Sequence, residues 1–481
     1  MKRIEKFLNS GWYIALIFAI TYLSWLFYED TPPQAFNRYN LMGFFILASL
    51  LFLLMLFYEN TMYTMPVILS FLFILNKKDM TFTTTVTEWW IYVALALVLL
   101  GPIVHWLRFR PKLKMGYFTL GLGLIALSYV LSMLHFPFEI EAVPVSMIGV
   151  IYFGFYLFLT ATTKGRLKYL FQIFLFLNFL FTLQLGTYLY RGYLLHPELS
   201  FVDRLFVGWG RNLGWANVND MAFYIALTLP AYVYFIFKKP KINWFLWFLM
   251  APPFIVIILS ESRGGIIGFM ISFISLIIFV ILKGRFKILI QMAVFLLFIG
   301  LLFLYYQEVL FKWWDTMYQS FKSDINTVSS GRINIYLEGL AVFKQYPIFG
   351  GGWTSLQKLH PGSRLFMYHS TPIQALAAMG SFGMVALLIH YYQVFSFYIR
   401  RISFEKWLFL IGYLASQAHG LIDNVQYAVP YSIIMVVVFA LWENAPKTDF
   451  TLLKGRYRYE PEAEITIPRS KKRNERAMSI S

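Results

Sequence analysis

Long apolar stretches recur along the whole chain, and they restrict its fold more than any other feature. A helix that crosses a bilayer needs about 20 mostly apolar residues, and runs of that kind follow one another with only short polar segments between most of them. Of the 481 residues, 59% are hydrophobic and only 14% are charged, whereas a soluble domain has roughly a quarter charged residues. The sequence therefore predicts an integral membrane protein, an all-α polytopic bundle of about 12 to 14 transmembrane helices.

Fourteen apolar runs are candidate spans, of which the second and third are short and closely joined. They are Trp12–Tyr28, Leu41–Tyr58, Met62–Leu75, Trp89–Leu107, Gly116–Leu134, Val143–Ala161, Tyr169–Tyr190, Met221–Phe237, Trp244–Leu259, Gly265–Leu282, Phe286–Tyr306, Pro372–Phe397, Trp407–Leu421 and Tyr427–Trp442. The first run lacks a cleavage site of small residues, so we expect it to be retained as a span.

Lys and Arg collect in alternate loops, which indicates the orientation of the chain. If Met1 is cytoplasmic, five basic loops lie on the same side as Met1, and the opposite loops are mixed or acidic apart from Lys77 and Lys78. The five loops are His105–Lys114, Thr162–Lys168, Lys238–Lys241, Lys283–Lys287 and Arg400–Lys406. We therefore expect both termini in the cytoplasm. These loops also account for the net charge of +17, and without a recognisable binding motif we expect no nucleic-acid partner.

This orientation places three polar stretches on the outer face, at 191–220, 260–265 and 307–369. In the first, Arg211 and Asn219 are candidate substrate-binding residues, although capping the next helix is the more ordinary role of an asparagine at that position. In the second, Arg263 stands at a helix boundary. An arginine there either extends to the lipid headgroups or pairs with a neighbour such as Glu261, or it binds an anionic ligand.

The longest polar interval, 307–369, is predicted to be an extracytoplasmic loop that contains short helices. Its Trp313–Trp314 pair suits a membrane interface. A helix is expected over Arg332–Lys344, capped by the preceding Ser and Gly residues and ended by Pro347 and three glycines. Its apolar face is expected to hold Ile333, Leu337, Leu340 and Ala341. Arg332 then lies in the first helical turn, where backbone N–H groups favour anions.

His369 stands just before a predicted membrane helix, since Ser370 and Thr371 form a capping pair and Pro372 suits the first turn. The helix dipole there favours a neutral imidazole, which can accept a proton. The alternative is an interfacial histidine that only caps the helix or binds water. Ser370 is a further substrate-binding candidate. Together, the guanidinium groups of Arg263 and Arg332 could bind a diphosphate while His369 takes a proton.

Several other kinds of chemistry lack their usual residues. The chain has no cysteine, which excludes disulfides, thiolate nucleophiles and Cys-ligated metals. The outer carboxylates lack the Asp-x-Asp pairing or His grouping that Mg²⁺ and Zn²⁺ sites usually show. No P-loop or dinucleotide fingerprint occurs either. We therefore expect neither a metal nor a cofactor.

Five short motifs, in order along the C-terminal half, resemble those of the O-antigen ligase and polymerase superfamily of bacterial membrane glycosyltransferases. They are Asn217–Asn219 and Ser262–Gly264 at the starts of spans, Ser330–Arg332 and Pro347–Gly352 at the two ends of the loop helix, and His369 before a span with Gly380 and Gly383. The resemblance implies a multi-pass protein of the bacterial cytoplasmic membrane with its active site at the outer face. It also implies transfer of an oligosaccharide from undecaprenyl diphosphate to a glycan or lipid acceptor, without a metal or a nucleotide sugar.

By the same resemblance, Arg263 and Arg332 are expected to bind the diphosphate and His369 to be the general base. The chain differs from many members at Ser370, where they have Asn. The motifs do not separate a polymerase from a ligase. A rival class, a lipid-linked oligosaccharide flippase or other transporter, predicts charged residues near the middle of the spans, whereas the charges here gather at their outer ends.

These features divide the chain into three predicted parts. Residues 1–190 hold the N-terminal transmembrane helices. Residues 191–445 form the core that resembles the O-antigen ligases and polymerases, with the extracytoplasmic loop at 307–369. Residues 446–481 are a basic cytoplasmic tail, which its composition predicts to be disordered.

Overall fold

Most helices of this protein run roughly parallel to one another, as expected for spans that cross one membrane. The computed structural model describes residues 2–26, 38–74, 89–134, 142–206, 213–215, 217–238, 244–322, 331–360, 367–445, 448, 450–453 and 455–459. Within these residues, seven helices are long and apolar enough to cross a membrane, and six shorter apolar helices accompany them. The predicted all-α, multi-pass membrane bundle is therefore confirmed.

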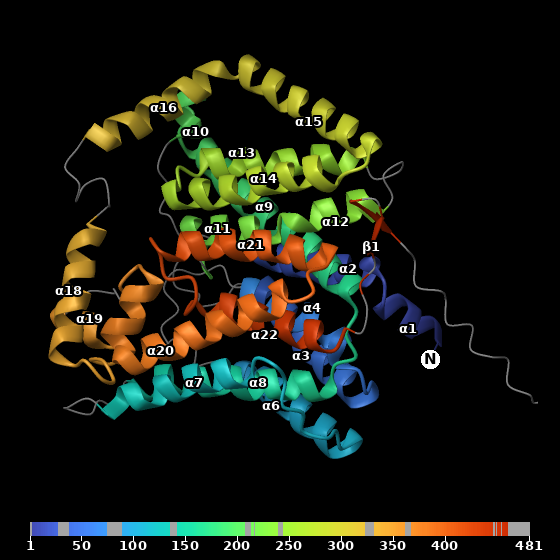
Figure 1. The fold of residues 1–481 in the computed structure, drawn as a ribbon, viewed down its shortest axis with the longest axis vertical. Coiled ribbons are helices and arrows are strands. Elements are labelled where there is room, and N and C mark those ends of the chain that lie inside the picture. The colour runs from blue at the N-terminus through green and yellow to red at the C-terminus, as the bar shows by residue number, and fades with distance from the viewer. Residues whose placement is uncertain are drawn as a thin grey trace, which may run out of the picture.

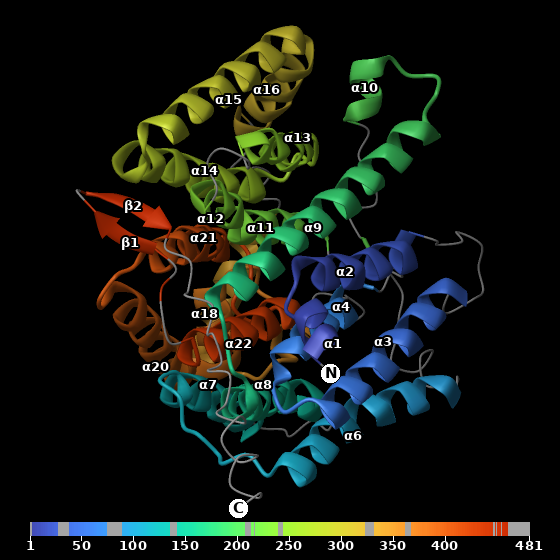
Figure 2. The same cartoon turned by 90° about the vertical axis from the view of Figure 1, so that its right-hand side faces the viewer.

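The N-terminal part contributes α6, α7 and α8 at the lower edge of the bundle in Figure 1 and the long diagonal helix α9 in Figure 2. Within it, α3 packs against α6, α7 against α8, and α2 against α9. The elements are α1 (Lys2–Leu8), α2 (Gly11–Leu26), α3 (Arg38–Phe57), η1 (Thr61–Thr64), α4 (Met65–Phe73), α6 (Trp89–Phe109), α7 (Thr119–Leu131), η2 (Ser132–Leu134), α8 (Ala142–Thr162) and α9 (Leu167–Leu195).

The C-terminal part contains the remaining helices. They are α10 (Phe201–Leu205), α11 (Val218–Thr228), α12 (Pro230–Lys238), η3 (Trp244–Met250), α13 (Ala251–Leu259), α14 (Arg263–Lys283), α15 (Phe286–Tyr305), α16 (Gln307–Lys322), α18 (Arg332–Gln345), α19 (Ser355–Leu359), α20 (Thr371–Ile399), α21 (Phe404–Gly420) and α22 (Val429–Glu443). The helices α16, α18 and α19 of the predicted loop lie at one end of the bundle, opposite α1 and β1 (Figure 1).

The centre of the bundle is the nearly continuous helix formed by α11 and α12. It is apolar on all sides, and 89% of its span is buried. A helix that is apolar all round is expected in the interior of a bundle. It packs against α9, α14 and α21, as Figure 2 shows in a view along the bundle. Because α11 and α14 are neighbours, the turns that precede them meet at the same end of the molecule.

Helix α18 agrees with its predicted bounds, but the predicted apolar face is wrong. Leu337 is 60% exposed and Ala341 is also exposed, whereas Gly339 and Val342 are buried. A Cβ atom on Gly339 would lie 2.6 Å from the Ile373 side chain and 2.8 Å from the Tyr368 ring. Close backbone approach to α20 therefore decides which face is buried, and a glycine contributes no hydrophobic signal to a sequence pattern.

Helix α20 is broken at Gly380, and the turn after α18 forms backbone hydrogen bonds with the residues around this break. Gly380 has φ 66° and ψ −161° inside the helix. The backbone N–H groups of Gly351 and Gly352 donate to the carbonyls of Ala377 and Ala378 at 2.8 and 3.1 Å, and that of Ser381 donates to Pro347 at 2.8 Å. Polar backbone groups freed by a helix break must find partners inside a membrane protein. The turn supplies them, and we call this arrangement, residues 347–352 with 377–382, the backbone clamp.

The described part of the predicted tail is folded, so the expected disorder is wrong for these residues. Strands β1 (Phe450–Leu453) and β2 (Arg456–Tyr459) pair antiparallel. The hairpin packs against α12, α14 and α21, and the rings of Phe450 and Phe404 lie 4.0 Å apart. Two buried aromatic side chains, Phe450 and Tyr457, attach it to the bundle. Residues 460–481 lie outside the described part of the chain.

Candidate active site

Asp423 joins two of the three predicted catalytic residues. Its Oδ2 atom accepts a hydrogen bond from Arg332 Nη2 at 3.2 Å, and its Oδ1 atom lies 3.2 Å from Nδ1 of His369. A second nitrogen of Arg332, Nη1, donates to the Ile422 carbonyl. Arg332 begins α18, His369 precedes α20 and Asp423 follows α21. The start of the loop helix α18 and the end of the loop therefore meet at one carboxylate.

The ionisation of Asp423 defines which nitrogen of His369 carries a proton. Burial raises the pKa of the Asp423 carboxyl, but the hydrogen bond with His369 and the charge of Arg332 outweigh it, so the pKa lies below the ordinary aspartate value. An ionised carboxylate can only accept hydrogen bonds. Nδ1 of His369 must therefore be the donor, which leaves Nε2 of the neutral ring with the lone pair that a general base needs.

A strained backbone fixes the orientation of His369. This residue has φ 48°, in the left-handed region that costs a residue with a Cβ atom about 1–3 kcal/mol. Tyr336, one helical turn after Arg332, donates from its hydroxyl to the His369 carbonyl at 2.9 Å. Residues four apart lie on one face of a helix. The same face of α18 thus holds Asp423 through Arg332 and the strained His369 through Tyr336.

The turn that carries Arg263 lies against the same segment. Arg263 is the first residue of α14, and Ser262 caps the helix by accepting from Gly265 N at 3.1 Å. A Cβ on Gly264 would lie 3.1 Å from the buried ring of His419 and 2.7 Å from Ile422. His419 Nε2 is 4.0 Å from Asp423 Oδ2. The backbone of the Arg263 turn is therefore next to the Asp423 segment, and convergence of its side chain with Arg332 stays a prediction.

The three predicted substrate-binding residues differ in how well the structure defines their contacts. Asn219 is not the helix cap, because Asn217 occupies that position and forms a capping box with Asp220. Instead, Asn219 Oδ1 accepts from Ser262 Oγ at 2.6 Å and ties the α11 turn to the Arg263 turn. Ser370 is the buried N-cap residue of α20 but makes no side-chain cap hydrogen bond. Arg211 lies outside the described residues. A substrate role for all three stays a prediction.

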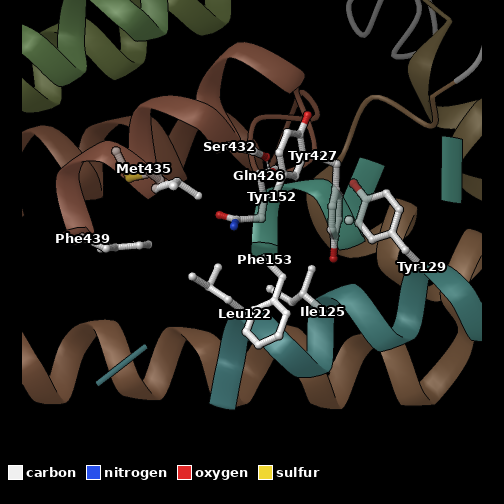
Figure 3. Close-up of a pocket in the computed structure, with 12 residues that line it drawn as sticks. Leu122, Ile125, Tyr129, Tyr152, Phe153, Gln426, Tyr427, Ser432, Met435 and Phe439 are labelled. Carbon is white, nitrogen blue, oxygen red and sulfur yellow. Dashed lines mark hydrogen bonds between the residues drawn. The ribbon is translucent and has the colours of Figure 1, made fainter. Parts of the chain in front are cut away.

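A small cavity lies behind the Asp423 segment (Figure 3). It has a volume of about 30 Å³, and its lining includes Tyr129, Tyr152, Gln426 and Tyr427. Two of its polar atoms, the hydroxyl of Tyr427 and Oε1 of Gln426, are buried and make no hydrogen bond within the part of the chain that the structure describes. About 10–15 Å³ of such space holds one water molecule. The cavity suits one or two waters that support this segment, and it is too small for a sugar.

Among the described residues, no three His, Asp or Glu side chains are grouped so as to hold a metal ion. The described residues at this end of the membrane bundle include a hydrogen-bonded His–Asp–Arg group. Sequence reasoning missed Asp423, although the predicted topology places 422–426 on the same face as the large loop. An acidic residue that directly follows a span, on the same predicted face of the membrane as the large loop, is the signal that could have indicated Asp423.

The fold is that of a polytopic membrane protein, and three candidate site residues, Arg332, His369 and Asp423, gather at one end of the bundle. The comparison with known families makes the class more specific, because residues 245–388 match the family model described as O-antigen ligase. This match supports the predicted resemblance to the O-antigen ligase and polymerase superfamily, and with it a membrane glycosyltransferase of that general type. The match includes Arg263, Arg332 and His369 but not Asn219 or Asp423. No curated protein matches the chain.

Proposed function

We propose that this protein transfers an oligosaccharide from an undecaprenyl diphosphate donor to a glycan or lipid acceptor, at the outer face of the bacterial cytoplasmic membrane. The observation that carries the proposal is the bridge that Asp423 forms between Arg332 and His369, in a chain that matches the O-antigen ligases. A guanidinium and an oriented imidazole are what a metal-independent transfer from a diphosphate requires. Both termini then lie in the cytoplasm, and α1 and β1 lie at the end of the bundle opposite the site (Figure 1).

The proposed reaction is a single displacement with inversion. Nε2 of His369 takes the proton of the acceptor hydroxyl, whose oxygen forms a bond to the anomeric carbon. The bond from that carbon to the phosphate oxygen breaks, and the electron pair leaves with undecaprenyl diphosphate. Arg332 and Arg263 stabilise the charge that grows on the leaving group. Arg332 has five N–H donors, and its two described contacts leave donors for the phosphate.

Replacing His369 with alanine should reduce transfer by about a hundred- to ten-thousand-fold, the usual contribution of a general base. The measurement is polysaccharide formation in cells and transfer from a purified lipid-linked donor, with membrane abundance checked in parallel. Replacing His360, which pairs with Glu338 at 2.8 Å in the same loop, is the matched control and should leave transfer near the original rate. Full polymer synthesis by His369→Ala at normal abundance would refute the proposed role.

Arg332→Lys should impair transfer nearly as much as Arg332→Ala. Two different nitrogens of the guanidinium contact the Ile422 carbonyl and Asp423, and a single ammonium group cannot reproduce that planar fork. The loss should be at least about a hundred-fold, as for other preorganised groups that stabilise developing charge. Activity close to that of the unmodified protein in Arg332→Lys would show that only a positive charge is needed there.

Polymerase and ligase differ in their acceptor, and one experiment separates them. The reconstituted protein is given purified lipid-linked repeat units and no second acceptor. Chain lengthening identifies a polymerase. Transfer that begins only after a lipid or glycan acceptor is added identifies a ligase.

A further inference from the structure

An apolar pocket of about 310 Å³ lies between α10, α13, α15 and α16. It is distinct from the cavity in Figure 3 and about ten times larger. Its walls are apolar or aromatic side chains, among them Phe201, Leu205, Ile258, Leu259, Leu302 and Leu310. Figure 1 shows α15 and α16 arching over α13 at this side of the bundle.

The setting of the pocket is the hydrocarbon region of the membrane near its surface. One wall belongs to α15, which is apolar and long enough to span the bilayer. The next helix, α16, has exposed Phe311, Trp314 and Tyr318 at the spacing of one helical face, as in helices that lie in the interface. Lys312 of α16 pairs with Asp203 of α10, and each lies two residues from a side chain that lines the pocket. An apolar pocket with a charged pair close by suits a hydrocarbon chain that ends in a polar headgroup.

Two residues of the pocket wall come just before the Arg263 turn in the chain. Ile258 and Leu259 line it, and Arg263 begins the next helix four residues after Leu259. Four trans peptide units span at most about 15 Å between Cα atoms. The first isoprene units of a lipid diphosphate held at Arg263 would therefore be able to reach the pocket wall at Leu259.

We propose that this pocket binds the first isoprene units of the donor's polyprenyl chain. The inference rests on the proposed function, and it adds the location of the donor's lipid chain. A cavity of about 150 Å³ holds one benzene molecule, so about 310 Å³ holds roughly two such groups, or two to three isoprene units. The rest of the chain continues along the membrane-facing side of α15.

The test compares two donors that carry the same oligosaccharide diphosphate, one on an undecaprenyl chain and one on an ethyl group. Leu302→Trp fills the pocket, and Leu301→Trp places the same ring on the 56% exposed neighbour. We expect Leu302→Trp to raise KM for the undecaprenyl donor about tenfold or more, since several buried CH₂ groups are displaced. Turnover of the ethyl donor and the behaviour of Leu301→Trp should be unchanged. Equal effects on both donors, or no effect, overturn the inference.

A binding measurement keeps this test independent of transfer. A photoreactive benzophenone derivative of farnesyl diphosphate should label α13 or α15 in the unmodified protein, and much less in Leu302→Trp and in a second filling variant, Ile258→Trp. Thermal midpoints in detergent confirm that the variants are folded. Labelling confined to other helices, or labelling that phosphatidylglycerol competes away, overturns the inference. Labelling at the pocket without transfer from either donor would instead contradict the proposed function.

Discussion

Asp423→Asn should reduce glycan transfer by about a hundred- to ten-thousand-fold while the protein stays folded. The carboxylate holds Arg332 and His369 from its two oxygens, and asparagine keeps the shape but loses the charge. Its amide can donate to Nδ1 of His369, which stabilises the tautomer with the proton on Nε2. The general base would then be blocked, as happens when the acidic member of a Ser-His-Asp triad becomes an amide. Transfer from a purified lipid-linked donor measures the loss.

The matched control for this change is Glu338→Gln. Glu338 also pairs with a histidine in the same loop, His360, at 2.8 Å, but this pair is more exposed. Exposed ion pairs contribute about 0–1 kcal/mol, so transfer and thermal midpoint should stay near those of the unmodified protein. Activity of Asp423→Asn equal to that of Glu338→Gln would contradict the assignment of Asp423 as the residue that positions His369 and Arg332.

Gly380→Ala should destabilise the protein by about 3 kcal/mol or more. The φ of 66° with ψ of −161° belongs to a region that is essentially restricted to glycine and strains other residues by about 1–3 kcal/mol. A Cβ would also overlap the Ile348 carbonyl oxygen and the Gly350 nitrogen, so the backbone clamp must open and lose buried hydrogen bonds. We expect low membrane abundance and a lower thermal midpoint in detergent.

Gly300→Ala provides the comparison, because Gly300 lies in α15 and nothing would lie within 4 Å of its Cβ. Alanine is the better helix former by about 1 kcal/mol, so this variant should be as stable as the unmodified protein or slightly more stable. If Gly380→Ala and Gly300→Ala had the same thermal midpoint, the clamp would not contribute to stability.

The elements that the sequence predicted well are those with local signals. Hydropathy located the bundle, and the proline and glycines after α18 located its end, since both depend on residues near one another in the chain. His369 and Arg332 could be selected as candidates because each lies at the start of a helix, where backbone N–H groups favour anions and a neutral imidazole. These predictions depend on interactions between residues that are close in the sequence, and they do not require knowledge of how the helices pack.

What the sequence could not show is how distant segments pair. Asp423 is a single acidic residue after a span, and nothing near it indicates that it meets residues 54 and 91 positions earlier. The capping role predicted for Asn219 was wrong because Asp220, three residues after Asn217, forms a capping box with Asn217, and Asn219 instead accepts a hydrogen bond from Ser262. The buried face of α18 was wrong because close approach at Gly339 outweighed the apolar pattern.

The backbone clamp has a consequence for chimeric proteins. The turn 347–352 and the break at 377–382 recognise each other through main-chain atoms and through the absence of side chains at Gly350 and Gly380. The large loop is therefore fitted to one particular span and is not an independent module. Exchanging loops between relatives should succeed only when residues 347–352 and 377–382 are taken from the same parent, so acceptor specificity is best transplanted as a loop together with its span.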